Sequence, residues 1–264
     1  MLSRFWPFKV AISFIIGDTD VNLVNKVIVI TGGTSGIGRQ IVDQLHAQNT
    51  IIVIARNSKR LEQLKKRYKN VICFSADLSD PECYKPLSEQ IKAQYPRIDV
   101  LINNAAVQNE PLFTDPNFEY EQIAREINVN FTAVCSLSFL LLPALNASDS
   151  QSVILNINSG LSFVAKKSAC VYCASKAALN LFSQSLSYQL EHTNIKVLQA
   201  FIPLVDTPMT QGRGDNKISA ECAAKSILKG LKRQDPQHDI GKIKILRILN
   251  ALTPSLAKRI LKGA

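Results

Sequence analysis

This sequence of 264 residues lacks the patterns that mark membrane spans, disulfide frameworks and metal sites. No stretch approaches the roughly 20 apolar residues that a membrane-spanning helix needs. Its three histidines are not paired with a second ligand motif, so we expect no metal site. Its six cysteines have no disulfide-framework spacing, which favours a reducing, cytoplasmic compartment. A redox pair at Cys170-x-x-Cys173 is the less favoured alternative, because no thioredoxin-like context surrounds it.

Acidic residues are in the minority: 31 Lys and Arg stand against 21 Asp and Glu, a formal net charge of +10. Such an excess of positive charge can favour binding to a nucleic acid, an anionic membrane or an anionic cofactor. No recognised nucleic-acid-binding motif accompanies it, so we expect no nucleic-acid partner. The hydrophobic fraction of 46% is ordinary for a globular protein with a sizeable core.

Apolar runs typical of buried strands alternate with helical stretches along the chain. They lie at 26–30, 51–55, 71–75, 99–102, 153–157 and 195–202. This alternation predicts a single α/β domain, a Rossmann-type doubly wound parallel sheet of about seven strands flanked by helices. We assign 26–241 to that domain, 1–25 to an N-terminal extension and 242–264 to basic amphipathic C-terminal helices. Residues 119–142 read as one long helix, with Pro143 just past its end.

A glycine-rich loop, T-G-G-T-S-G-I-G at 31–38, follows the first strand and opens a helix over 39–48. Glycines let the backbone approach a pyrophosphate, and the helix N-terminus supplies N–H groups and a partial positive charge. Strand, loop and helix in this order predict a dinucleotide site. The second strand ends in Ala55 and Arg56 rather than in the carboxylate of an NAD site, which favours NADP(H), with NAD(H) as the alternative. The alternative is that Arg56 has no role in cofactor binding and is only the first of several basic residues in the helix that follows.

Tyr172 and Lys176 are four residues apart, so on a helix their side chains share one face. A lysine ammonium beside a tyrosine favours the phenolate and lowers its pKa from about 10, which suits proton transfer near neutral pH. Ser159 follows the apolar run 153–157, and a hydroxyl at that strand end can be aimed at the same point. The alternative is an exposed Tyr–Lys pair without a catalytic role.

Together with Asn103-Asn104-Ala105-Ala106 after the fourth strand, these motifs resemble the short-chain dehydrogenase/reductase family over roughly 26–232. The resemblance implies an oxidoreductase that transfers a hydride between NADP(H) and a small-molecule carbonyl or alcohol. It also implies that Ser159 polarises the carbonyl, that Tyr172 donates the proton, and that Lys176 holds ribose hydroxyls.

Asn130 resembles the fourth catalytic residue of the family, which links the lysine to bulk water. Asn128 is the competing match, and Asn130 fits the family's order of residues better. The strings S-G-L-S-F-V, V-Y-C-A-S-K and P-L-V-D-T further resemble a bacterial subgroup of oxidoreductases labelled with D-alanine esterification of teichoic acids.

The resemblance implies a cofactor-binding set as well. Its members are Gly32, Thr34, Ser35, Gly36, Ile37, Gly38, Arg56, Asp77, Leu78, Asn104, Ala105, Tyr172, Lys176, Pro203, Val205 and Thr207. Two departures from the family's P-G-x-x-x-T pattern weaken the last part of it. Leu204 replaces the glycine, and Thr207 lies one residue early. The stretch 208–216, which contains two glycines, reads as a mobile lid.

Partners follow from the remaining features. The apolar end of the 119–142 helix and the small-residue face with Ala174, Ala177 and Ala178 resemble a family interface, so we expect a homodimer or homotetramer. Both termini combine apolar residues with positive charge, which suits weak contact with the inner face of an anionic membrane, with Trp6 and Phe8 at headgroup level. The alternative is that they pack on the domain. A rival interpretation of the whole chain is a non-catalytic nucleotide-binding or membrane-associated scaffold on the same fold.

Overall fold

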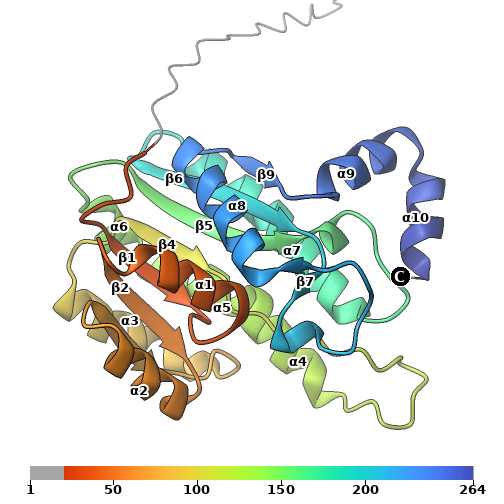
Figure 1. Cartoon of the computed structure of the whole chain (residues 1–264), viewed down its shortest axis with the longest axis horizontal. Coiled ribbons are helices and arrows are strands. Elements are labelled where there is room, and N and C mark those ends of the chain that lie inside the picture. The colour runs from red at the N-terminus through yellow and green to blue at the C-terminus, as the bar shows by residue number, and fades with distance from the viewer. Residues whose placement is uncertain (1–20, 264) are drawn as a thin grey trace, which may run out of the picture.

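Seven parallel strands form the centre of the computed structural model, which describes residues 21–263 (Figure 1). Their order is β3-β2-β1-β4-β5-β6-β9. The bounds are β1 Val27–Thr31, β2 Thr50–Ala55, β3 Val71–Ser75, β4 Val100–Asn103, β5 Ser152–Ser159, β6 Ile195–Ile202 and β9 Gln237–Asp239. The chain moves outward from β1 to β3 and restarts with β4 on the other side of β1. The expected doubly wound parallel sheet is therefore confirmed.

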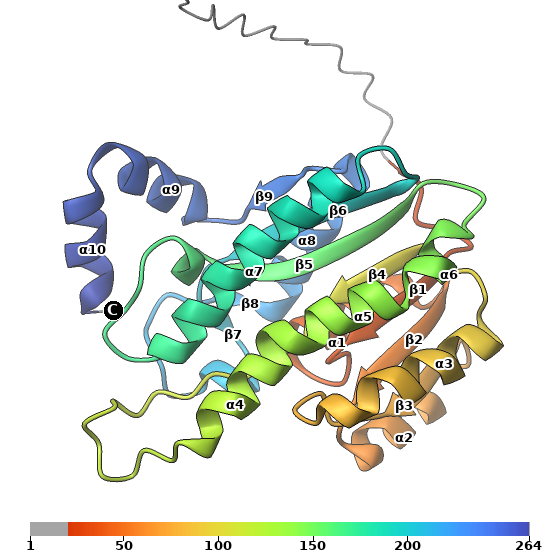
Figure 2. The ribbon, with the colours of Figure 1, turned by 180° about the vertical axis from the view of Figure 1, so that it is seen from behind.

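Helices cover both faces of the sheet (Figures 1 and 2). One face carries α1 (Gly36–Leu45), α2 (Ser58–Arg67) and α8 (Ala220–Arg233), and the other carries α3 (Tyr84–Gln94), α5 (Ala133–Leu140) and α7 (Cys170–Gln189). Ile28 and Ile30 of β1 pack on the α1 side, whereas Val29 between them packs on the α3 side. Because both faces are buried, the central strands such as β1 and β2 are apolar at successive positions.

The long helix predicted over 119–142 is present over 121–140, but it is not a regular α-helix. A π-turn over Asn128–Thr132 joins α4 (Glu121–Ile127) to α5, and in it the Ala133 N–H donates to the Asn128 carbonyl five residues back. The helix restarts as α6 (Leu142–Asn146), which holds Pro143 in its first turn, where a missing N–H costs little. Turns of the π type are rare and concentrate at functional sites.

The last part of the described chain forms two short helices, α9 (Ile243–Leu252) and α10 (Pro254–Lys262), which we call the C-terminal hairpin. Figure 1 shows it beyond β9, at one end of the sheet. The proline at the start of α10 separates the helices, because it cannot donate a helical hydrogen bond.

The hairpin is anchored at both ends. Arg247 donates to both carboxylate oxygens of Asp239, at 2.7 and 2.6 Å, and its guanidinium lies over the rings of Phe163 and Phe201. At the other end, the Lys262 carbonyl accepts from a backbone N–H of the β5–α7 loop at 3.3 Å. A bidentate Arg–carboxylate pair is geometrically specific, so the middle of α9 is held to β9.

Two findings bear on the sequence predictions about membranes and metals. No helix within residues 21–263 is long and apolar enough to cross a bilayer. Across those residues, no group of three His, Cys, Asp or Glu side chains is arranged to hold a metal ion. The predicted insertion of Trp6 and Phe8 falls outside the described residues.

Candidate active site

A crevice opens where the strand order reverses, at the carboxyl ends of β1 and β4. The glycine loop follows β1, and Asn104 and Ala105 follow β4. The two segments touch, because a Cβ on Gly32 would lie 3.0 Å from Ala105 Cα. A cavity of about 780 Å³ extends from this crevice along the ends of β5 and β6.

The glycine loop has a backbone that glycine adopts without strain. Gly32 has φ +72° and Gly36 has φ +52°, both in the left-handed region. A Cβ on Gly38 would lie 2.4 Å from the Gly32 carbonyl oxygen, so no side chain fits between loop and helix. Of the predicted loop residues, Gly32, Thr34, Ser35, Gly36 and Ile37 line the cavity, whereas Gly38 does not. The start of α1 therefore presents free backbone N–H groups to the cavity, as a pyrophosphate site requires.

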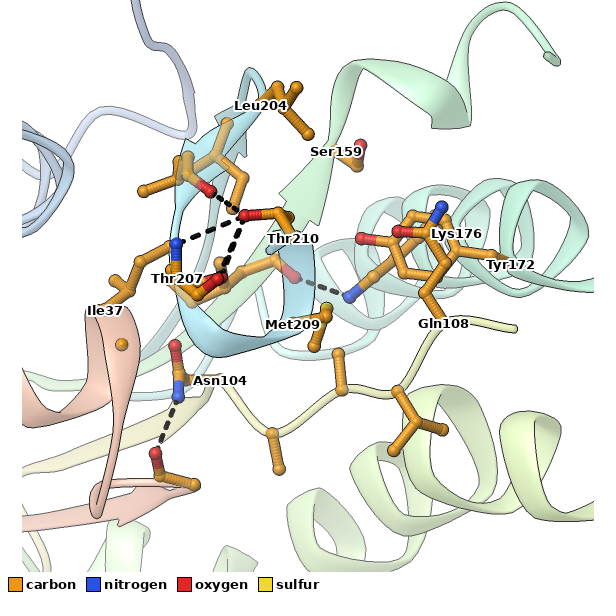
Figure 3. Close-up of a pocket in the computed structure, with 18 of the residues that line it drawn as sticks. Ile37, Asn104, Gln108, Ser159, Tyr172, Lys176, Leu204, Thr207, Met209 and Thr210 are labelled. Carbon is orange, nitrogen blue, oxygen red and sulfur yellow. Dashed lines mark hydrogen bonds between the residues drawn. The ribbon is translucent and has the colours of Figure 1, made fainter. Parts of the chain in front are cut away.

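Amide side chains join β4 to both of its neighbours. Asn104 Nδ2 donates to the Thr31 carbonyl at 2.9 Å, and the N–H groups of Asn104 and Ala105 donate to Thr31 Oγ1. Asn103 Nδ2 donates to Asn156 Oδ1 of β5 at 2.8 Å. These bonds fix the strand ends beneath the cavity, where Figure 3 shows Asn104.

Cations gather at the end of the cavity next to β2. Arg56 Nη1 lies 4.0 Å from Asp77 Oδ2, and both residues line the cavity together with Leu78. Burial alone would raise the pKa of the Asp77 carboxyl, but hydrogen bonds from Ser79 and the charge of Arg56 hold that pKa below its ordinary value. Arg60 lines the same region and adds a second guanidinium, which the sequence patterns did not single out.

Pro203, Val205 and Thr207 line the cavity opposite the glycine loop. Thr207 caps a short 3₁₀ turn: its N–H donates to Thr210 Oγ1 at 3.1 Å, and the two hydroxyl oxygens are 3.3 Å apart (Figure 3). A Cβ on Gly36 would lie 3.1 Å from the Thr207 methyl carbon. Thr207 therefore lies at the cavity wall despite its shift of one residue.

Ser159, Tyr172 and Lys176 lie close together at one wall of the cavity (Figure 3). Ser159 ends β5, whereas Tyr172 and Lys176 are buried in the first two turns of α7, with Nζ 5.8 Å from the centroid of the tyrosine ring. Ser159 Oγ accepts the Leu161 N–H at 3.2 Å, so its own proton remains available for Tyr172 or for a ligand. Lys176 Nζ donates to the Ile157 carbonyl at 2.9 Å and has two further protons to donate.

The protonation of this group differs from the prediction. Burial raises the pKa of the Tyr172 phenol to about 12, and the Ser159 hydroxyl offsets only part of the rise. Burial also lowers the pKa of Lys176 to about 8. The pKa of Tyr172 therefore lies above its ordinary value, rather than below it as expected from the neighbouring Lys176, because burial is the largest influence on the phenol. Tyr172 is a neutral phenol near pH 7, which is the form that donates a proton.

Asn130 lies in the π-turn and is fully buried. Its Oδ1 accepts the Val107 N–H, and its Nδ2 donates to the Val107 carbonyl, both at 2.8 Å. Nδ2 also lies 3.2 Å from Ser175 Oγ, next to the lysine of α7. Asn128, the competing match, donates instead to the Ser79 carbonyl near the Asp77 end of the cavity. The π-turn thus directs Asn130, rather than Asn128, toward the helix that carries Tyr172 and Lys176.

A charged bridge within the cavity lining escaped the sequence patterns. Glu110 Oε1 accepts from Lys166 Nζ at 3.0 Å, and its Oε2 lies 3.4 Å from Arg213 Nε. Arg213 also donates to the Gln108 carbonyl at 3.2 Å. The bridge connects the loop after β4, the loop before α7 and the predicted lid at 208–216. Its members are far apart along the chain, so no local motif marks them.

Glu126 on α4 is a buried carboxylate that no motif marks either. Its Oε2 accepts from Asn109 Nδ2 at 3.2 Å, and its Oε1 has no partner within residues 21–263. Burial raises the pKa of Glu126 to about 7, and the hydrogen bonds from Asn109 offset only part of the rise. The raised pKa places the titration of Glu126 near neutral pH.

We expect Glu126 to make the protein less stable as the pH rises. The folded state binds more protons than the unfolded state between pH 4.5 and about 7, so the free energy of unfolding falls through this window. Glu126→Gln removes this dependence. The melting temperature of the variant minus that of the wild type should therefore increase as the pH rises from about 5 to about 8. Glu121→Gln, an exposed position on the same helix, is the control. Parallel pH profiles for Glu126→Gln and wild type would contradict the assignment.

Comparisons of the sequence and of the fold with known proteins point to the same family. A family model described as "short chain dehydrogenase" matches residues 26–218. The chain is 34% identical over 219 residues to the "Uncharacterized oxidoreductase DltE" of Bacillus subtilis, which covers 80% of this chain and 86% of that protein. A short chain dehydrogenase from Burkholderia cenocepacia in complex with NADP has a similar fold, with a TM-score of 0.81 at 20% identity over 92% of this chain and all of that one. A short-chain dehydrogenase from Sphingobium yanoikuyae in complex with NADPH gives 0.76 at 24% identity over 88% and 94% of the two chains.

Proposed function

Because this chain belongs to the short-chain dehydrogenase family of oxidoreductases, we propose that it interconverts a carbonyl compound and an alcohol with NADP(H). The family and the DltE-like subgroup expected from the motifs are confirmed. The observation that carries the proposal is one cavity lined both by the glycine loop and by Ser159, Tyr172 and Lys176.

The cavity residues fit a nicotinamide dinucleotide. The glycine loop leaves no room for a Cβ at Gly38, and the start of α1 behind it suits a pyrophosphate. The free protons of Lys176 would hold ribose hydroxyls, and the backbone at Val205 and Thr207 would contact the nicotinamide end. When bound in reduced form, the cofactor supplies a hydride.

The protein's own residues then handle the proton. Ser159 donates its free hydroxyl proton in a hydrogen bond to the substrate carbonyl oxygen and polarises the carbonyl. Tyr172 donates its phenolic proton to the same oxygen as negative charge develops there. Lys176, buried beside the tyrosine, stabilises the phenolate left behind. Asn130 orders the backbone at Val107 and the start of α7, and so supports proton exchange between Lys176 and bulk water.

Cofactor turnover tests this proposal against the scaffold alternative. The purified protein is assayed with NADPH and a panel of aldehydes and ketones, and with NADP and the corresponding alcohols. We expect oxidation of NADPH that depends on the carbonyl compound. A protein that binds NADPH tightly but turns over none of the panel would instead favour a nucleotide-binding scaffold.

The preference for NADP(H) rests on the charges beside β2. Arg56 and Arg60 both line the cavity where an NAD site would present a carboxylate to the ribose 2′-hydroxyl. Guanidinium groups suit a 2′-phosphate, because they form charge-assisted hydrogen bonds with it.

We propose a homodimer or homotetramer that assembles through α5 and α7. Phe139 on α5 and Leu181 and Tyr188 on α7 are large exposed apolar side chains, and both helices lie on the same side of the sheet (Figure 2). Exposed apolar patches of this kind mark protein–protein contacts.

Leu181→Arg should weaken this assembly at least tenfold, because a guanidinium would have to be desolvated without a partner. Light scattering at micromolar concentration measures the mass. Leu252→Arg is the matched control, because Leu252 on α9 is 76% exposed and Leu181 is 67% exposed. A wild type of monomeric mass, or a Leu181→Arg variant of unchanged mass, would contradict the proposed interface.

We also propose that the C-terminal hairpin makes weak, salt-sensitive contact with anionic membranes. Leu252 and Leu256 are exposed at its turn, close in sequence to exposed Lys258 and Arg259. Each basic residue near such a surface contributes about 1 kcal/mol, so replacing both by glutamine should weaken binding to phosphatidylserine vesicles about tenfold or more at low salt. Co-sedimentation measures this. An intact protein that fails to co-sediment even at low salt would leave the hairpin with a packing role alone.

A further inference from the structure

The C-terminal hairpin forms an aliphatic wall of the active-site cavity. Six of its apolar side chains line the cavity that also holds Ser159 and Tyr172. They are Ile243, Ile245, Leu246 and Leu249 of α9, and Ile260 and Leu261 of α10. From Ile243 to Leu249 the helix rises about 9 Å, at 1.5 Å per residue, which is long enough to lie along several methylene groups.

This wall begins directly beside the reacting groups. Gly160 follows Ser159, and a Cβ on it would lie 2.6 Å from the Ile243 side chain and 3.1 Å from that of Leu246. The Arg247–Asp239 ion pair keeps α9 in this position. The wall is therefore a fixed part of the site, and it leads away from the serine that polarises the carbonyl.

The same wall continues to the outside of the molecule. Ile245 and Ile260 line the cavity and are nevertheless 68% and 53% exposed, which marks them as its rim. Leu204 and Met209, from the segments that follow β6, line the cavity and are partly exposed as well. Apolar side chains thus line the cavity continuously from Ser159 to solvent. Covering exposed apolar surface with an apolar ligand is favourable, because it removes that surface from water.

Charges in the cavity lining near this wall are only partly paired. Lys166 and Arg213 both face Glu110, which leaves one positive charge in excess, and Lys242 at the start of α9 lines the cavity as well. The hairpin contains no acidic residue. A compact, highly charged or sugar-like substrate would leave the aliphatic wall in contact with water.

We propose that the substrate is a carbonyl compound or alcohol with an extended aliphatic chain, and that the C-terminal hairpin binds this chain. The proposal rests on the function proposed above and names its substrate class. The reacting carbon lies at Ser159 and Tyr172, and the chain runs along α9 toward the rim at Ile245 and Ile260.

The test compares unbranched aldehydes from propanal to decanal, with NADPH as the reductant. Burying one methylene group against an apolar wall is worth a factor of about four, so kcat/KM should rise about fourfold per added carbon until the chain passes the rim. Ile245→Glu should lower kcat/KM for decanal at least tenfold and that for propanal less than threefold.

Ile248→Glu is the matched control. Ile248 is on the same helix and is 51% exposed, but it does not line the cavity, so its replacement should leave the chain-length dependence unchanged. Equal effects of the two variants on decanal, or a wild type whose kcat/KM is independent of chain length, would overturn the proposal while propanal turnover still supports the reductase.

A calorimetric measurement distinguishes the chain-binding site from the proposed reaction. Decanol should bind to the NADPH-loaded wild type at least tenfold more tightly than butanol, and Ile245→Glu should remove most of that difference. Preferential binding of decanol without turnover of any aldehyde would retain the chain site and overturn the proposed reaction. Equal affinity for the two alcohols would overturn the chain site.

Discussion

Replacing Tyr172 by phenylalanine is expected to lower kcat by about 10² to 10⁴-fold, the range that a positioned proton donor contributes. The phenol is buried at the cavity wall, 5.8 Å from Lys176 Nζ measured to the ring centroid, and phenylalanine keeps the ring while it removes the transferable proton. Affinity for NADPH should therefore change little. Steady-state kinetics and a fluorescence titration with NADPH measure the two quantities.

Tyr188→Phe is the control for that experiment. It makes the same substitution on the same helix at an exposed position, and turnover should be retained. If Tyr172→Phe keeps more than a few per cent of the wild-type kcat, another group donates the proton. A parallel loss of NADPH affinity would instead indicate that the variant damages the cofactor site.

Arg56→Asp is expected to shift the ratio of kcat/KM for NADPH over NADH by about 100-fold toward NADH. Hydrogen bonds to a charged group are worth about 1.5–3 kcal/mol, and the new carboxylate both repels a 2′-phosphate and accepts from a 2′-hydroxyl. Arg60 would remain in the cavity lining and preserve some preference for the phosphate. The measurement is the specificity ratio with one carbonyl substrate.

Arg67→Asp provides the matched control, because Arg67 ends the same helix α2 and is not part of the cavity lining. It should leave the ratio as it is in the wild type. If Arg56→Asp changes the ratio by less than about twofold, well under 1 kcal/mol, the assignment of the 2′-phosphate to Arg56 is wrong.

Much of the fold could be predicted from short stretches of sequence. The strands were recognisable because both of their faces are buried, which leaves apolar residues at successive positions such as Ile28, Val29 and Ile30. Tyr172 and Lys176 were recognisable because helical spacing alone puts them on one face. In each case the physical cause acts within about ten residues.

The remaining features depend on contacts between distant segments. The π-turn accompanies the bonds of Asn130 to Val107 and Ser175, which no helical pattern over 119–142 contains. The pKa of Tyr172 depends on how completely its surroundings exclude water, and spacing does not report that. The C-terminal segment is basic and amphipathic whether it lies on a membrane or along a cavity, so its pattern could not reveal that it lines the candidate active site.

The C-terminal hairpin, which we propose selects the substrate, is anchored to different elements from those that carry the proposed catalytic residues. The hairpin is tied to β9 and to the β5–α7 loop, whereas Tyr172 and Lys176 belong to α7 and Ser159 to β5. Exposed wall positions such as Ile245 and Ile260 can therefore change without disturbing Ser159, Tyr172 or Lys176. For protein engineering, α9–α10 is therefore a segment that could be exchanged between related enzymes. Transferring it together with the Arg247–Asp239 ion pair offers a route to transfer a substrate preference to a related enzyme.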